Sequence, residues 1–254
     1  MAIFGISRSH GGVQVEEGAR KFAERLGARA GLPVELRVER DYQDLFDALT
    51  TGRVTLAWLP PLLYARAAVD GLTLAAVPER AGGLLYRSAI LVARAAPFRS
   101  AAELRATRAA WVDQNSASGY MFPRQYLVGV GVTFSTETFH GSPNVAAQEV
   151  TAGRADLSTC PVPGNDAKQA SRGVRDVLGA TAKMLRVLAV TDAIPPDGLV
   201  FSPDSTDSVK RQLASALLEM HEDEAGLLAM RLLFNAERLL GSTDATARMF
   251  RRRT

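Results

Sequence analysis

The stretch that decides the fold is Trp111-Val112-Asp113-Gln114-Asn115-Ser116-Ala117-Ser118-Gly119-Tyr120-Met121-Phe122-Pro123-Arg124. We expect it to run from an apolar strand, through a turn rich in hydroxyl groups, into a helix. Such a turn directs backbone N–H groups, two serine hydroxyls and the positive end of a helix dipole toward one point. Helix starts of this kind bind phosphate-like oxyanions. The simpler alternative is a helix cap made by Asn115 or Ser116, and spacing alone leaves both interpretations open.

The composition places the chain among soluble globular proteins. Its 254 residues are enough for one large domain or two smaller ones, with 47% hydrophobic and 22% charged residues. No apolar run reaches the roughly 18 residues of a membrane-spanning helix. The net charge is +3, but the basic residues are scattered, apart from the cluster Arg251-Arg252-Arg253. We therefore expect neither nucleic-acid binding nor membrane insertion.

Cysteine and histidine usage argues against an internal disulfide and against metal chemistry. Cys160 is the single cysteine, and His10, His140 and His221 lie far apart in the sequence. We expect no metal and no cofactor. The first residues are typical of a buried strand rather than a signal peptide, so the chain as written is expected in the cytoplasm unless a signal has been removed.

Strand and helix patterns alternate along the chain, which predicts an α/β protein with largely parallel sheets. No flexible linker is present, so two lobes would be joined by strands that cross at 93–98 and 190–196. Residues 1–92 and 196–254 would then form one lobe and 93–195 an inserted second lobe. We expect strands at 3–6, 34–38, 54–59, 74–77, 87–92, 111–112, 155–160 and 185–190, and helices at 15–28, 41–51, from about 100, 146–152, 206–220 and 223–239.

The opening stretch resembles the block D-x-N-S-x-S-G-Y-x-x-P-R of the phosphate/phosphonate substrate-binding proteins of ABC importers. Other segments are similar to further blocks of that family, in the same order and at similar spacing: 41–54, 57–62, Tyr86-Arg87-Ser88-Ala89-Ile90-Leu91-Val92, 97–104, 146–156 and Ile194-Pro195-Pro196-Asp197. The resemblance covers nearly the whole chain. It implies a two-lobed type II periplasmic-binding-protein-like clamshell, with two mixed sheets flanked by helices and a ligand cleft between the lobes.

The resemblance also implies a set of ligand-binding residues. The phenols of Tyr42 and Tyr86 would reach a small oxyanion from the first lobe. The second lobe would hold it with Ser116, Ala117, Ser118 and Gly119, through both serine hydroxyls and the N–H groups of Ser118 and Gly119. Asp197 corresponds to a carboxylate that faces the ammonium group of aminophosphonates. From the residues themselves we add Arg8, whose guanidinium could pair with an oxyanion or remain an exposed loop group.

Two positions depart from the family pattern and leave the ligand open. Ala117 replaces the middle hydroxyl residue of an S-T-S triplet, and Pro143 stands where the family has a histidine. His140 lies nearby but out of register. One interpretation is therefore that this chain binds a different oxyanion from its relatives.

Two classes of function follow. The first is a non-catalytic binding protein that closes on a phosphonate, phosphate ester or phosphite-like solute, for uptake with an ABC permease or for sensing with a partner. The alternative is a cytoplasmic enzyme of the same fold, similar to menaquinone-pathway dehydratases or thiamine-pyrimidine synthases. The residues show no paired carboxylates and no nucleophile beside a base, and leave His10, His140 and Asp197 as proton carriers.

Overall fold

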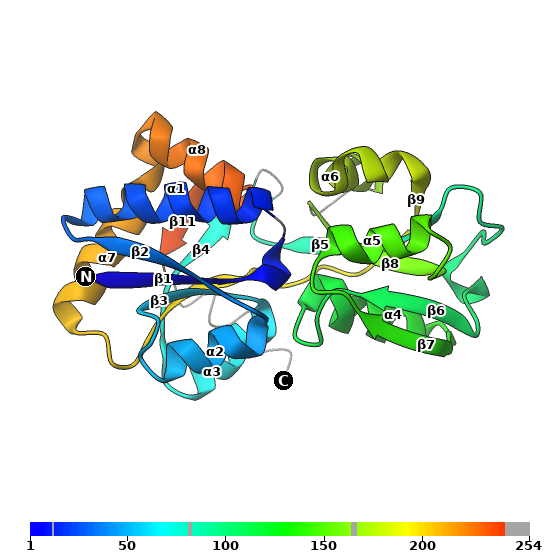
Figure 1. Cartoon of the computed structure of the whole chain (residues 1–254), viewed down its shortest axis with the longest axis horizontal. Helices are drawn as coiled ribbons and strands as arrows, with labels where there is room; N and C mark the ends of the chain where they lie inside the picture. Colours follow the sequence, from blue (N-terminus) through cyan, green and yellow to red (C-terminus); the bar gives the residue numbers. More distant parts are fainter. Residues whose placement is uncertain (12, 81–82, 164–166, 242–254) are drawn as a thin grey trace. The chain divides into compact units, whose positions relative to one another are not determined.

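A computed structural model describes residues 1–11, 13–80, 83–163 and 167–241 (Figure 1). The chain divides into two compact units. Unit 1 comprises residues 1–84 and 195–254, and unit 2 comprises residues 85–194. The basic cluster at Arg251–Arg253 lies outside the described residues.

Unit 1 is built on a mixed sheet of six strands in the order β11-β4-β10-β3-β1-β2. β1 lies parallel to β2 and β3, whereas β10 runs antiparallel to β3 and β4, and β11 antiparallel to β4. The chain thus enters this sheet through parallel strands and returns to it in the opposite direction. The strands are β1 Ala2–Ser7, β2 Val34–Glu39, β3 Leu56–Leu59, β4 Thr73–Glu79, β10 Gly198–Phe201 and β11 Arg238–Gly241.

Helices cover both faces of this sheet (Figure 1). One face packs on α1, α7 and α8 through a core that includes Phe4, Phe22 and Phe234. The other face packs on α2 and α3 through Leu45, Leu49 and other buried apolar residues. The helical segments are η1 Arg8–His10, α1 Val13–Ala30, α2 Tyr42–Thr50, α3 Pro61–Val69, α7 Asp207–Glu219, η5 Met220–Glu222 and α8 Glu224–Phe234.

Local chemistry explains where these helices begin. Asp41 caps α2 because its Oδ1 accepts a hydrogen bond from the N–H of Asp44 at 2.8 Å. Pro61 is the first residue of α3, a position where the missing N–H costs nothing. Pro60 and Pro61, which follow β3, thus form the start of this helix.

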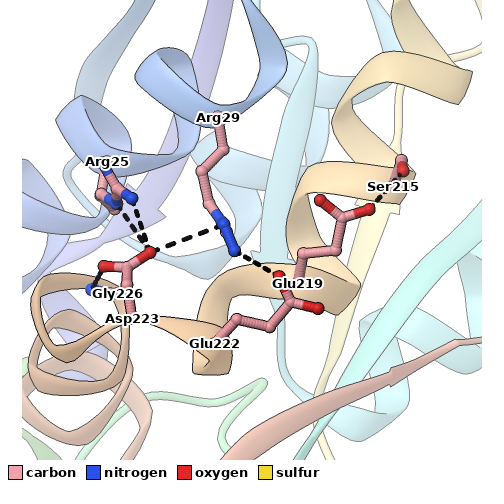
Figure 2. Close-up of polar contacts among 7 residues, drawn as sticks. All are labelled: Arg25, Arg29, Ser215, Glu219, Glu222, Asp223 and Gly226. Carbon is pink, nitrogen blue, oxygen red and sulfur yellow. Dashed lines mark hydrogen bonds and ion pairs between the residues drawn. The ribbon is translucent and has the colours of Figure 1, made fainter.

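Charged residues join α1 to the start of α8 (Figure 2). Arg25 Nη2 lies 2.6 Å from Asp223 Oδ2, and Arg29 Nη2 lies 2.7 Å from Glu222 Oε2. Asp223 Oδ1 also accepts from the N–H of Gly226 at 2.8 Å, which caps α8. The hydrogen bond from Arg25, followed by that from Gly226, lowers the pKa of Asp223. One carboxylate thus starts α8 and ties it to α1.

Unit 2 is built on a mixed sheet of five strands in the order β7-β6-β8-β5-β9. β6 is parallel to β7 and β8, and β5 is antiparallel to β8 and β9. α5 and α6 pack on one face, and α4 packs on the other, where its Leu127 shares a core with Trp111. The elements are β5 Tyr86–Ala93, η2 Ala101–Glu103, β6 Thr107–Trp111, η3 Ala117–Met121, α4 Phe122–Gly129, β7 Phe134–Phe139, α5 Pro143–Thr151, β8 Leu157–Pro163, α6 Ala167–Leu178, η4 Gly179–Met184 and β9 Leu185–Val190.

The first boundary differs from the one we expected. Residues 85–92 belong to unit 2, because β5 pairs with β8 and β9. The chain therefore leaves unit 1 after Leu84 rather than after residue 92, and it returns at Pro195, one residue earlier than expected.

Two predicted helices are wrong in extent. The segment from about 100 forms only the short turn Ala101–Glu103, since Leu104 is buried and Ala106 turns the chain into β6 with a φ of 54°. The last helix ends at Phe234 because Asn235 adopts a left-handed φ of 52°. Residues Arg238–Gly241 then pair with β4 as β11. None of the helices in the described ranges is long and apolar enough to cross a membrane.

Substituting Gly226 with alanine should lower stability, since the new Cβ would lie 2.0 Å from the carbonyl oxygen of Met220. Overpacking of this kind costs about 1–3 kcal/mol. The matched control is Gly129→Ala at the end of α4, where a Cβ meets nothing within 4 Å. The control should leave stability unchanged or raise it by up to about 1 kcal/mol. Urea unfolding measures both, and equal midpoints for the two variants would contradict this account of the α8 start.

Candidate ligand-binding site

The predicted hydroxyl-rich turn lies at the end of β6 in unit 2. Ser116 caps it, because its Oγ accepts from the N–H of Gly119 at 3.0 Å. The next residues, Ala117–Met121, form one π-helical turn in which Met121 N–H donates to Ser116 O at 3.0 Å. This turn leads directly into α4. π-turns of this kind are frequent at functional sites.

Hydroxyl groups from two neighbouring strands hold the turn in place. Ser88 Oγ on β5 donates to the carbonyl oxygen of Ser118 at 2.6 Å. Thr159 Oγ1 on β8 donates to the carbonyl oxygen of Gly119 at 3.1 Å. Both hydroxyl residues are fully buried. The N–H groups in the same two rigid peptide planes are those of Gly119 and Tyr120, which donate to Ser116 Oγ and O, so these bonds fix the turn that carries Ser118.

Several hydrogen-bond donors of the turn are not used by acceptors of the described part of the protein. In the described part of the chain, neither the N–H nor the hydroxyl of Ser118 has a protein acceptor, and the proton of the Ser116 hydroxyl has none either. Ser116 is only 6% and Ser118 only 8% exposed, so water competes weakly for these groups. The N–H of Gly119, which we expected to hold a ligand, instead donates to Ser116 Oγ. A Cβ at Gly119 would lie 2.5 Å from the Cβ of Val112, which explains the glycine.

An ion pair and a group of packed aromatic rings support the same turn. Arg124 donates to both carboxylate oxygens of Glu137, at 2.8 and 3.0 Å, and Trp111 Nε1 donates to Oε2 at 3.0 Å. The hydrogen bond from Arg124 is the main cause that lowers the pKa of Glu137. The ring of Tyr120 packs edge-on against Trp111 and Phe139, with centroids 5.5 and 5.0 Å apart. The quoted stretch thus supplies both the turn and much of its support.

Unit 1 gathers polar groups around Asp197, which is 6% exposed. Arg80 pairs with both carboxylate oxygens, Nη1 to Oδ1 at 2.9 Å and Nη2 to Oδ2 at 3.1 Å. The indole N–H of Trp58 donates to Oδ2 as well. Burial alone would raise the pKa of Asp197, but the charge of Arg80 and these hydrogen bonds lower it. The carboxylate is therefore ionised and is engaged by protein donors.

The rings of His10, Trp58 and Tyr42 form one aromatic cluster beside this ion pair. The imidazole of His10 stacks on the indole of Trp58 at 3.8 Å, with the ring planes 10° apart. Tyr42 meets the same imidazole edge-on at 4.8 Å, and its phenol donates to the carbonyl oxygen of Ser9 at 3.2 Å. The structure thus brings Tyr42 and Asp197 into one region of unit 1.

The remaining sequence-predicted residues have varied surroundings. Tyr86, in unit 2, is half-buried at the start of β5 and pairs through its backbone with Ile194. The side chain of Arg8 is 70% exposed and lies 4.0 Å from Glu16. Pro143 starts α5, and His140 contacts Thr138 Oγ1 at 2.8 Å. Cys160 is buried, which raises the pKa of its thiol and makes it a small core residue.

Sequence reasoning missed the partners of these groups. Ser88 and Thr159 lie 30 and 40 residues from the carbonyls that they hold, and Arg80 lies 117 residues from Asp197. Ser88 did fall within a block that resembles the family. Arg80 carried no signal in the sequence. In the described ranges no group of three acidic, histidine or cysteine side chains could hold a metal ion.

Ser88→Ala should lower the free energy of unfolding by about 1 kcal/mol, because the carbonyl of Ser118 loses a buried donor. Ser135→Ala is the matched control, since Ser135 is exposed on β7 of the same sheet. It should unfold at the same urea concentration as the parent protein. Identical midpoints for Ser88→Ala and Ser135→Ala would show that the strand hydroxyl does not hold the turn.

Asp197→Ala should cost about 3 kcal/mol or more, since removing one partner of a buried ion pair leaves the other charge uncompensated. The control is Glu149→Ala, which breaks the exposed pair with Arg154 and should hardly shift the melting temperature. Thermal melts at pH 7 compare the two. A melting temperature for Asp197→Ala equal to that of the control would contradict the structural role of the Arg80–Asp197 pair.

Comparison with known proteins gives a consistent result. A family model described as ABC transporter, phosphonate, periplasmic substrate-binding protein matches residues 4–246. The structure of PhnD1 from Prochlorococcus marinus in complex with methylphosphonate is similar with a TM-score of 0.84 at 17% identity, over 99% of this chain and 96% of that chain. A binding-protein component of an ABC phosphonate transporter from Pseudomonas aeruginosa is similar with a TM-score of 0.82 at 20% identity, over 98% and 85% of the two chains.

A protein of Xanthomonas citri bound to ATP shares the fold as well, with a TM-score of 0.76 at 18% identity, over 99% of this chain and 94% of that chain. At these identities the structural matches show the fold alone, which is the type II periplasmic-binding-protein-like arrangement of two mixed sheets flanked by helices. The family model, by contrast, spans nearly the whole sequence. The chain therefore belongs to the family of periplasmic phosphonate-binding proteins of ABC transporters.

Proposed function

We propose that this chain is a non-catalytic binding protein for a small oxyanion such as a phosphonate, a phosphate ester or phosphite. The observation that carries the proposal is the turn at Ser116–Gly119. Its sheltered donors lack protein acceptors in the described ranges, and they lie at the start of a helical segment. Donors fixed before the ligand arrives need little reorganisation, and the helix dipole favours a negative charge there.

The other predicted residues enter the proposal as further ligand contacts. Tyr42 and Asp197 lie in the polar and aromatic region of unit 1, and Tyr86 starts a strand of unit 2. Arg8 has an exposed guanidinium, which suits an anion. Asp197 is the least direct of these contacts, because both its oxygens already accept from Arg80.

The family supports a role in transport. Its members are periplasmic and bind phosphonates for ABC transporters, and the P. marinus relative is a complex with methylphosphonate. We propose uptake through an ABC permease as the role of this chain, with sensing through a partner as the second candidate. We include sensing because a histidine kinase sensor domain has a similar fold, with a TM-score of 0.58 at 16% identity.

The enzyme alternative is not favoured. The family that matches nearly the whole chain consists of binding proteins. Of the three proton carriers considered from the sequence, Asp197 is paired with Arg80, and burial lowers the pKa of His10 to about 3. Neither group is poised to exchange protons near neutral pH.

Isothermal titration calorimetry with methylphosphonate, phosphite, inorganic phosphate, methanesulfonate and acetate tests the proposal. We expect saturable binding of at least one phosphorus oxyanion and weaker or no binding of acetate. A flat response to every member of this panel would reject the proposed function.

Ser118→Ala should raise the Kd for the best ligand by about tenfold or more, since a hydrogen bond to a charged group is worth about 1.5–3 kcal/mol. Ser135→Ala serves again as control, because it lies on an exposed strand of the same unit. An unchanged Kd for Ser118→Ala would remove the Ser118 hydroxyl from the binding site even if the protein binds the ligand.

A further inference from the structure

The carboxylate of Glu137 on β7 joins the two ends of the hydroxyl-rich turn. Its Oε2 accepts from the indole N–H of Trp111 at 3.0 Å, and its two oxygens accept from Arg124 at 2.8 and 3.0 Å. Trp111 is the last residue of β6, which enters the turn, and Arg124 lies in the first turn of α4, which leaves it. One side chain from a neighbouring strand therefore holds the segment 112–121 at its entry and at its exit.

Both contacts of Glu137 are of a strong kind. Trp111 is 0% exposed, so water cannot replace the carboxylate as the acceptor of its indole N–H, and a buried donor without an acceptor is costly. Arg124 donates through two N–H groups, which fixes the direction of the guanidinium as well as its distance. The hydrogen bond from Arg124, with a smaller one from Trp111, lowers the pKa of Glu137, so the carboxylate is charged near neutral pH.

The exit end of the turn determines where the N–H of Ser118 points. This N–H shares a rigid peptide plane with the carbonyl group of Ala117. The Ala117 carbonyl oxygen accepts from the N–H of Phe122, the first residue of α4. The strand hydroxyls hold the carbonyls of Ser118 and Gly119, which lie in the two following planes. The plane that carries the proposed ligand donor is therefore fixed by the start of α4.

The ring of Tyr120 links the same two partners of Glu137 to the turn. It packs edge-on against the indole of Trp111, with centroids 5.5 Å apart, and the guanidinium of Arg124 lies 5.8 Å from its centroid. The N–H of Tyr120 donates to the carbonyl oxygen of Ser116 inside the turn. A displacement of the indole or of the guanidinium would therefore be transmitted to the backbone of the turn.

We propose that Glu137 is a positioning residue for the bound oxyanion. By holding Arg124 and Trp111, it fixes the start of α4 and so the direction in which the Ser118 N–H donates. The proposal rests on the proposed function and assigns to Glu137 an effect on affinity, although its own carboxylate acts through protein groups. It also commits Arg124, the one cation of the stretch 111–124, to Glu137 rather than to the ligand.

Two substitutions and a matched control test this role. Glu137→Ala removes the acceptor of both donors, whereas Glu137→Gln keeps one amide oxygen that can accept from Trp111 or Arg124. The control is Glu149→Ala, because Glu149 on α5 of the same unit accepts from Arg154 at 2.7 and 2.8 Å in an exposed pair. Calorimetry measures the Kd of each variant for methylphosphonate and for inorganic phosphate, at a temperature where all of them are folded.

We expect Glu137→Ala to raise the Kd by about tenfold and Glu137→Gln by about threefold, because a loosened donor must be ordered when the ligand binds. Glu149→Ala should match the parent protein. A Kd for Glu137→Ala equal to that of the control, even with a lower melting temperature, would overturn the positioning role and leave the proposed function standing. If the parent protein binds neither ligand, the proposed function fails and this inference fails with it.

Proton–nitrogen NMR without ligand separates the position of the turn from the stability of the fold. In Glu137→Ala the indole signal of Trp111 and the amide signals of Ser118 and Phe122 should shift or broaden. In Glu149→Ala all three signals should stay in place. Amide signals of Ser118 and Phe122 that coincide in Glu137→Ala and in the parent protein would overturn the proposal, whichever ligand the protein binds.

Discussion

The hydrogen bonds from Ser88 and Thr159 to the carbonyl oxygens of Ser118 and Gly119 are the constraint on which the candidate site depends. They attach the turn to two adjacent strands, β5 and β8, which pair with each other from Tyr86–Pro163 to Val92–Leu157. The same turn is braced by the Arg124–Glu137 pair and by the ring of Tyr120. The turn that carries the N–H and hydroxyl of Ser118 is thereby anchored to the sheet.

The polar groups of unit 1 are arranged around a buried ion pair. A buried carboxylate, Asp197, is surrounded by donors from Arg80 and Trp58, and the aromatic rings of His10 and Tyr42 pack next to them. Arg80 also donates from Nε to the carbonyl oxygen of Phe234 at the end of α8. The ion pair therefore ties together β4, the start of β10 and α8, which gives it a structural role. His10 is the group in this cluster whose polar atom remains unsatisfied in the described ranges.

Local chemistry in the sequence predicted much of the fold and part of the site. Ser116 is one of the two cap residues expected from the sequence, and the structure confirms it; the helix expected from residue 41 begins with Asp41 as its cap. β11 could not be predicted, because Arg238–Gly241 continues an apolar helical pattern and becomes a strand only through pairing with β4. The role of Asp197 was equally hidden, since its partner Arg80 is brought to it by the tertiary fold. Residue types predicted which groups could bind an anion, whereas long-range contacts determine which of them stay available.

We propose that the turn at Ser116–Gly119 holds an oxyanion through the N–H and hydroxyl of Ser118. Proton–nitrogen NMR of the backbone during a titration with methylphosphonate tests it most directly. We expect the amide proton of Ser118 to move strongly downfield and this shift to saturate with the same Kd as calorimetry. A Ser118 amide signal that stays in place while the protein saturates with the ligand would contradict the account.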